Sequence, residues 1–135
     1  MDDVALNKSA VIERCLARVR EEHGGDDRSL DDLTKQDSIV LNLQRACEAS
    51  IDLGMHLVRR HRLGIPQDSR DAFELLVRGA DLDRELAGRL ARMVGFRNVA
   101  VHDYQALNLD IVRAIVHDHL DDLAAFARWA LQRPP

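Results

Sequence analysis

Apolar residues recur every three or four positions through most of the chain, and this spacing restricts the fold more than any other feature. The clearest repeat lies between Asp37 and His61 and comprises Ile39, Val40, Leu43, Ala46, Cys47, Ile51, Met55 and Val58. A period near 3.6 residues places such side chains along one face of a helix. Because only 7 glycines and 3 prolines interrupt the 135 residues, long helices can form. We therefore predict an all-α fold.

The same periodicity, combined with capping and stop signals, predicts about five helices. Their expected ranges are Val4 to His23, Asp37 to His61, Asp68 or Ser69 to about Gly79, about Leu82 through Val94, and Asn108 through Ala130. The acidic segment between the first two helices is only weakly periodic, so we expect a surface connection with a short turn near Leu30 to Leu33. Short connections favour an antiparallel bundle, and a chain of this length fits one domain spanning residues 1–135.

Charge and composition exclude several classes of protein. A net charge of −4 and a pI near 5.8 argue against non-specific coating of nucleic acid through a broad basic face. No stretch approaches the roughly 18 to 20 apolar residues of a membrane span, and the start, Met1-Asp2-Asp3, is acidic where a signal peptide would be basic. We expect a cytoplasmic protein without membrane association. Cys15 and Cys47 form no CxxC pair and lie on apolar faces, so we expect buried free thiols.

The segment Arg97-Asn98-Val99-Ala100-Val101-His102-Asp103-Tyr104 does not have the pattern of an ordinary core. It brings together an arginine, which can grip a phosphate in two places, and a histidine, which carries protons near neutral pH. Cleavage of RNA without a metal needs both functions. The 2′-hydroxyl must lose a proton, the leaving 5′-oxygen must gain one, and the phosphoryl charge must be held. By residue type, Arg97 and His102 are therefore candidates for the catalytic pair of an endoribonuclease that needs neither metal nor cofactor.

The spacing of this pair restricts how the site can be built. On a continuous helix, five residues advance the chain by about 500°, so Arg97 and His102 would point roughly 140° apart. One solution is a helix that ends within the motif, so that His102 turns back toward Arg97. The other is a symmetric dimer, in which the same segment of a second chain completes the site. The two solutions are compatible, and both remain open at this point.

Other charged clusters give weaker signals. Between Arg84 and Arg97 there are four arginines and a single acid, which predicts a local basic strip in which Arg89 and Arg92 contact RNA. The run Arg59-Arg60-His61-Arg62 is at least as well explained by cations at a helix carboxyl end. His117 and His119 suggest a metal pair, but positions i and i+2 lie about 200° apart on a helix and cannot hold one ion together. We expect no metal site from this pair.

The segment from Gly95 to Tyr104 resembles the R-x4-H-x-Y motif of the HEPN superfamily, in particular its HepT toxin branch. The residues 35–44 and 48–54 and the closing helix are similar to the second and last helices of that family, so nearly the whole chain is covered. The resemblance implies a five-helix homodimer with a composite cleft and a ribonuclease toxin that uses Arg97 and His102. The resemblance also implies an antitoxin partner, an MntA-like nucleotidyltransferase that silences the toxin by AMPylation of Tyr104. For Asn98 two roles are open: it supports the site by positioning the phosphate or the His102 ring, or it is only a local hydrogen-bonding residue near a helix end.

Two other functions remain possible from the sequence. The chain could be a catalytically inactive HEPN-like module that binds nucleotide, RNA or its partner, because a fold by itself does not secure an activity. It could also be a plain helical dimerisation protein. The presence of both Arg97 and His102 favours the ribonuclease.

Overall fold

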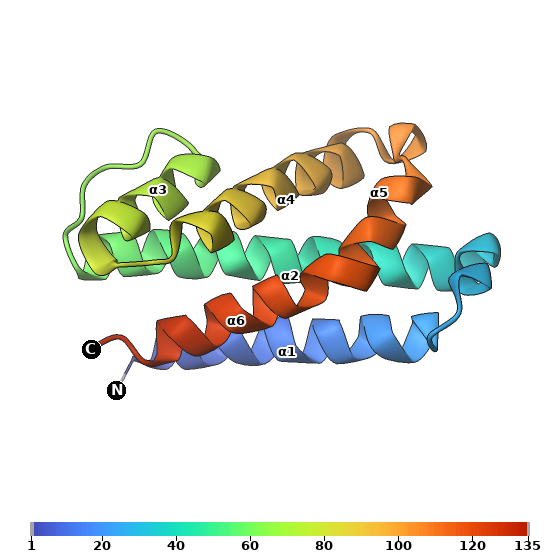
Figure 1. Cartoon of the computed structure of the whole chain (residues 1–135), viewed down its shortest axis with the longest axis horizontal. Helices are drawn as coiled ribbons and strands as arrows, with labels where there is room; N and C mark the ends of the chain where they lie inside the picture. The colour runs from blue at the N-terminus through green and yellow to red at the C-terminus, as the bar shows by residue number, and fades with distance from the viewer. Residues whose placement is uncertain (1, 135) are drawn as a thin grey trace.

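The computed structural model describes residues 2–134 and contains helices but no strand within that range. Figure 1 shows them as an elongated bundle. The α-helices are α1 (Asp3–His23), α2 (Leu33–Arg60), α3 (Ser69–Ala80), α4 (Arg84–His102), α5 (Leu109–Ala114) and α6 (Leu120–Leu131). Two 3-10 helices, η1 (Asp27–Asp31) and η2 (Tyr104–Ala106), and the π-helix η3 (Ile115–His119) complete the order. The all-α prediction is confirmed.

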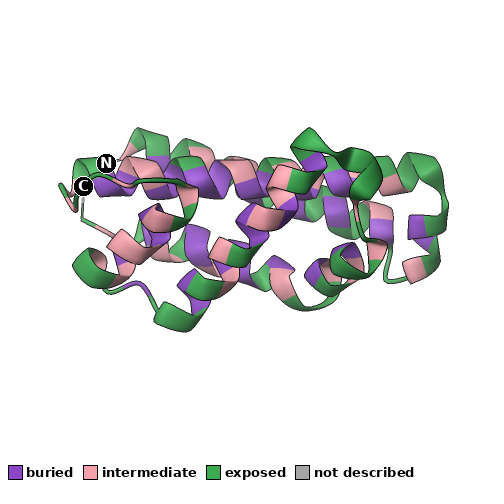
Figure 2. Ribbon diagram, turned by 90° about the horizontal axis from the view of Figure 1, so that it is seen from above, coloured by how far each residue is buried: buried purple, intermediate pink, exposed green. Residues whose placement is uncertain are grey.

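Helix α2 is the centre of the bundle. It packs against α1, α3, α4 and α6, and α1 runs antiparallel to it (Figure 1). Its inward face includes Ile39, Leu43, Leu53 and Val58, none of which has measurable exposure. Figure 2 shows buried positions recurring along the long helices, as the periodicity predicts. Burial of this apolar face is the main source of stability for helices in a domain of this size.

Helix α2 begins four residues earlier than predicted. The side chain of Asp32 accepts hydrogen bonds from the backbone N–H groups of Thr34 and Lys35, so Asp32 is the N-cap. Asp37, which we had taken as the start, therefore lies in the second turn. The expected short turn in the connection is present as η1, slightly earlier than predicted.

The last predicted helix is not continuous. The π-helix η3 separates α5 from α6, and its wide turn changes the spacing of the buried side chains. Val112 is buried before it, Ile115 is buried at its first position, and Leu120 and Leu123 are buried after it, so the step from Ile115 to Leu120 is five residues. A π-turn accommodates the extra residue and keeps both halves of the apolar face turned inward.

Both cysteines are free and buried, as predicted. Burial raises the pKa of the Cys47 thiol to about 12, so this thiol is protonated at neutral pH and acts as a small apolar group. Within residues 2–134, each helix is too short or too polar to cross a membrane.

Candidate active site

Helix α4 carries the predicted catalytic pair and stays regular through it. The helix is capped at its start by Asp83, and it ends only after His102, where the N–H of Asp103 donates to the carbonyl of Val99 at 2.8 Å. Arg97 and His102 are therefore about 7.5 Å apart along the helix axis and roughly 140° apart around it. The helix thus does not end between Arg97 and His102, and the completion of the site by a second chain stays a prediction.

Arg97 is held by its neighbour Asn98. The Arg97 Nε donates a hydrogen bond of 2.9 Å to the Asn98 side-chain oxygen, and both residues are half-buried. Across residues 2–134, Arg97 forms no salt bridge with a carboxylate. Its terminal nitrogens therefore carry a charge that no carboxylate neutralises, as an anion-binding arginine requires. Asn98 orients the guanidinium and makes no hydrogen bond to His102.

Tyr104 follows the helix in η2 and contacts a residue that sequence reasoning did not assign to the site. Its hydroxyl donates a 2.5 Å hydrogen bond to Oδ1 of Asp37 on α2. Burial and then this bonded carboxylate raise the pKa of Tyr104 to about 12, although 41% of the residue stays exposed. Asp37 could have been found only from its place at the amino end of α2, because nothing in its local sequence indicates a tyrosine partner 67 positions away.

Two of the four arginines in the predicted basic strip are paired with carboxylates, so the strip is less basic than the sequence indicates. Arg84 pairs with Glu74, and Arg89 Nε lies 3.1 Å from Oδ1 of Asp122. Because Asp122 is only 9% exposed, its pairing with Arg89 fixes α4 against α6. Arg92 is exposed and, in the part of the chain that the structure describes, has no salt bridge. Among the four arginines of this strip, Arg92 and Arg97 are thus the two that have no carboxylate partner in residues 2–134.

A groove of about 510 Å³ lies between α4 and the segment from η2 to η3. Its lining is mainly apolar and includes Met93, Phe96, Val99, Leu107, Ile111 and Ile115, with Arg89, Arg92, Asn108 and His119 as polar members. Neither Arg97 nor His102 lines it. Val99 and Ile111 are 38% and 51% exposed, so an apolar surface beside the motif faces solvent in the single chain.

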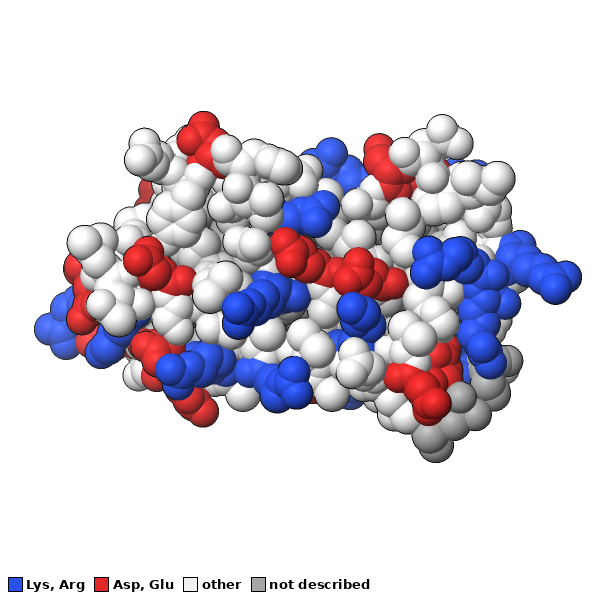
Figure 3. Space-filling view, turned by 180° about the vertical axis from the view of Figure 1, so that it is seen from behind, with Lys and Arg blue, Asp and Glu red and all other residues white. Residues whose placement is uncertain are grey.

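The second basic cluster lies elsewhere. Arg59 and Arg60 are in the last turn of α2, and Arg60 Nε lies 3.9 Å from a carboxylate oxygen of Asp2, which agrees with a role at the helix end. On the face shown in Figure 3, acidic and basic side chains are interspersed. This face has no continuous basic surface.

Comparison with known proteins identifies the family. Residues 12–129 match the family model "Ribonuclease HepT-like". The chain belongs to the HepT-like ribonuclease family. It is 49% identical over 126 residues to the mRNA nuclease HepT of Shewanella oneidensis, and the match covers 93% of this chain and 95% of that protein.

Solved structures extend the match of this HepT-like chain to the fold. One is the tri-AMPylated HEPN toxin of Shewanella oneidensis in complex with an MNT antitoxin, with a TM-score of 0.92 and 47% identity, covering 98% of this chain and 100% of that one. Another is a toxin–antitoxin with AMP-PNP, with a TM-score of 0.92, 45% identity and the same coverage. The resemblance to the HepT branch of the HEPN superfamily is confirmed.

The Tyr104 contact predicts a measurable titration in this HepT-like chain. Tyr104 is the only tyrosine, so the absorbance of tyrosinate reports this side chain alone. We expect a midpoint near pH 12 in the wild type and a lower midpoint in Asp37→Ala, because the variant loses both the acceptor and its negative charge. Because the pKa of Tyr104 is raised in the folded chain, its protonated hydroxyl contributes to the free energy of unfolding. This contribution is fully present below the ordinary pKa near 10 and is lost as pH rises through about 12.

The matched control is Asp103→Ala, which removes an exposed carboxylate next to Tyr104 in sequence that makes no hydrogen bond to its hydroxyl. This variant should shift the midpoint less than Asp37→Ala does. Circular dichroism at each pH shows whether the fold persists. Equal midpoints in the wild type and Asp37→Ala would contradict the assignment of the contact.

Proposed function

We propose that this chain is the toxin of a toxin–antitoxin pair and that it acts as a metal-independent endoribonuclease. The observation that carries the proposal is the end of α4, where an arginine without a carboxylate partner and an exposed histidine stand in the motif of a HepT-like ribonuclease. The relative from Shewanella oneidensis is named an mRNA nuclease, and its identity of 49% supports a cellular RNA as substrate. RNA substrates and two free buried cysteines fit the cytoplasm.

The chemistry requires only groups that the chain carries. The 2′-oxygen attacks the adjacent phosphorus as its proton passes to a base, and the bond to the 5′-oxygen breaks as that oxygen is protonated. The products are a 2′,3′-cyclic phosphate and a 5′-hydroxyl. His102 serves the proton steps, and Arg97, oriented by Asn98, binds the phosphoryl oxygens. Arg92 extends the positive charge along α4, whereas Arg89 acts through its pair with Asp122.

A homodimer completes the site in this proposal. Arg97 and His102 diverge on one continuous helix, so Arg97 of one copy and His102 of the other act on the same phosphate. A two-fold axis beside α4 brings both pairs together. The exposed apolar side chains near the motif, Val99, Val101 and Ile111, support contact with a second copy at this surface.

The antitoxin is a nucleotidyltransferase that AMPylates Tyr104. The similar HEPN toxin of Shewanella oneidensis is tri-AMPylated and bound to an MNT antitoxin. In the transfer, the Tyr104 oxygen attacks the α-phosphorus of ATP, pyrophosphate leaves, and the phenolic proton is released. Tyr104 is 41% exposed and lies two residues after His102. Each added AMP brings a negative charge and a base beside Arg97 and Arg92, where it competes with RNA and repels its phosphates.

The ribonuclease proposal predicts RNA cleavage in EDTA. Unmodified protein incubated with total RNA should cleave it and leave 2′,3′-cyclic or 3′-phosphate ends, detected by end-specific labelling. His102→Ala should reduce the rate by at least about 100-fold, because proton transfer by a positioned histidine contributes that much or more. As a control, His61→Ala removes a histidine outside the motif and should retain activity. The proposal fails if unmodified protein leaves RNA intact or if His102→Ala cleaves it equally well.

The composite site predicts complementation between two inactive variants. Arg97→Ala and His102→Ala are each expected to be inactive, but after mixing and subunit exchange a heterodimer contains one site with both groups intact. Random exchange makes half of the dimers heterodimers, each with one of two sites restored, so activity should approach about one quarter of the wild-type level. A pair of residues acting within one chain would give no recovery, and that result would rule out the shared site.

The regulatory proposal predicts where the modification occurs. Intact-mass measurement after co-expression with the antitoxin should show AMP-sized additions on the wild type and none on Tyr104→Phe. His102→Ala is the matched control, because it keeps the tyrosine and should still be modified. Additions that persist on Tyr104→Phe would place the modification on another residue type, since the chain has no second tyrosine.

A further inference from the structure

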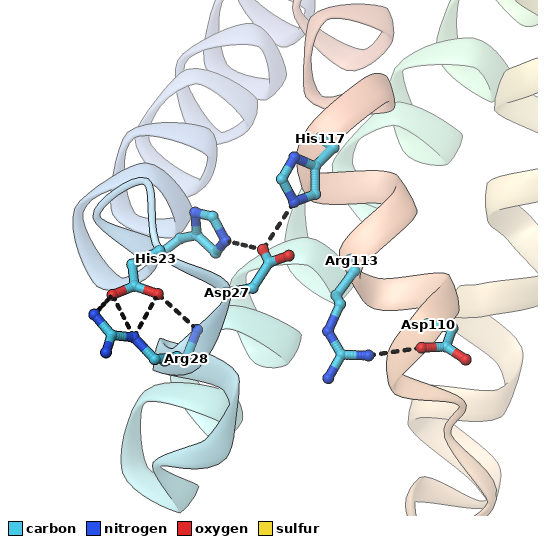
Figure 4. Close-up of polar contacts among 7 residues, drawn as sticks. His23, Asp27, Arg28, Asp110, Arg113 and His117 are labelled. Carbon is cyan, nitrogen blue, oxygen red and sulfur yellow. Dashed lines mark hydrogen bonds and ion pairs between the residues drawn. The ribbon is translucent and has the colours of Figure 1, made fainter.

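Three side chains from distant parts of the sequence meet where α1 ends. His23 is the last residue of α1, Asp27 is the first of η1, and His117 is in η3. Nε2 of His23 and Nε2 of His117 each lie 2.8 Å from Oδ1 of Asp27, and the two rings meet edge to face at 5.7 Å (Figure 4). The three atoms lie within 4.8 Å of one another.

Two imidazoles and one carboxylate are the ligands that zinc-class metals prefer. Zinc sites with three protein ligands commonly keep the fourth position for water. At the bond lengths of a tetrahedral zinc site, neighbouring ligand atoms are about 3.4 Å apart, so each nitrogen must move roughly half an ångström from Asp27. His117 and Asp27 have side-chain exposures of 53% and 43% and are free to make that shift, while His23, at 8%, provides a fixed ligand.

The local charges favour a cation in the middle of this cluster. The neighbouring Arg28 is paired with Asp26, and Arg113 is paired with Asp110 (Figure 4). Among the described residues, Asp27 makes no salt bridge to a lysine or arginine and contacts only the two histidines. Its carboxylate is therefore available to neutralise one charge of a divalent ion.

The backbone gives an independent reason to consider a ligand. His117 is the central residue of the π-turn. Such turns are rare in proteins as a whole, but those that occur are often found at functional sites. His117 faces Asp27, whereas His119 Nδ1 lies 2.9 Å from Asp122, so the two histidines of the closing segment contact different carboxylates. The metal pair considered from sequence, His117 with His119, is thus replaced by a different set of residues.

We propose that His23, Asp27 and His117 form a binding site for one zinc-class divalent cation per chain. The ion replaces the protons that now lie between the imidazoles and Asp27, so each histidine binds through an unprotonated Nε2. It joins η1 and η3 to the end of α1 and has a structural role. None of its ligands belongs to the motif on α4, so RNA cleavage in EDTA does not depend on it.

The test is zinc binding by the full-length chain freed of metal. Calorimetric titration with Zn²⁺ should show one ion per chain, and saturating Zn²⁺ should raise Tm by at least about 5 °C. In His117→Ala, where the lost side chain is exposed, affinity should fall at least roughly tenfold and the Tm shift at the same Zn²⁺ concentration should shrink accordingly. Asp27→Asn, which keeps the shape of the side chain, should lose binding as well. Co²⁺ should give a visible absorption band in the wild type that His117→Ala lacks.

His102→Ala is the matched control, because it removes another exposed histidine and should bind Zn²⁺ like the wild type. Circular dichroism and the metal-free Tm verify that each variant is folded. Absence of zinc binding by the wild type overturns the proposal. So does equal binding by His117→Ala, or loss of binding in His102→Ala, which would place the ion at the motif.

Discussion

Burial of α2 against four other helices sets the rotation of the helix that carries the candidate site. Helix α4 turns Met93, Phe96 and Ala100 inward, each 6% exposed or less. With this face fixed, Arg97 lies at the edge of the buried stripe and His102 points to solvent. A rotation of α4 that brought both groups to one point would expose Phe96 and Ala100, at the cost of their apolar contacts. The divergence of the pair therefore follows from packing of the core.

Much of this arrangement was predictable because it depends on local periodicity. The buried stripe of α2 and the end of α1 at His23, which is followed by Gly24 in the left-handed conformation, both depend on residues that are near one another in sequence. The start of α2 was misplaced because several acidic residues precede it, and only the hydrogen bonds of Asp32 distinguish the cap from Asp37. The π-turn was missed because a five-residue step between Ile115 and Leu120 looks like a small irregularity within a helical repeat.

Some residues of the candidate site could likewise be predicted from local sequence, and others could not. Arg97, His102 and Tyr104 are close in sequence, so their residue types and spacing indicate the chemistry without a structure. The partners Asp37 and Asp122 come from other helices and became apparent only in the folded chain. These two contacts change how the motif is understood: one holds the Tyr104 hydroxyl in place, and the other neutralises Arg89, which the sequence grouped with the RNA-binding arginines.

The π-turn connects these observations, because its two histidines contact different elements of the bundle. His119 contacts Asp122, the same carboxylate that binds Arg89 of α4, so this side of the turn is linked to the catalytic helix. His117 contacts Asp27, so the other side is linked to the end of α1. A regular helix would also separate the two side chains, but it would shift α6 out of register with its buried face. The wide turn thus allows α6 to pack while α5 and η3 form one wall of the groove beside the motif. A ligand that stiffens the His117 side would act on that wall through the backbone of η3, without contact with Arg97 or His102.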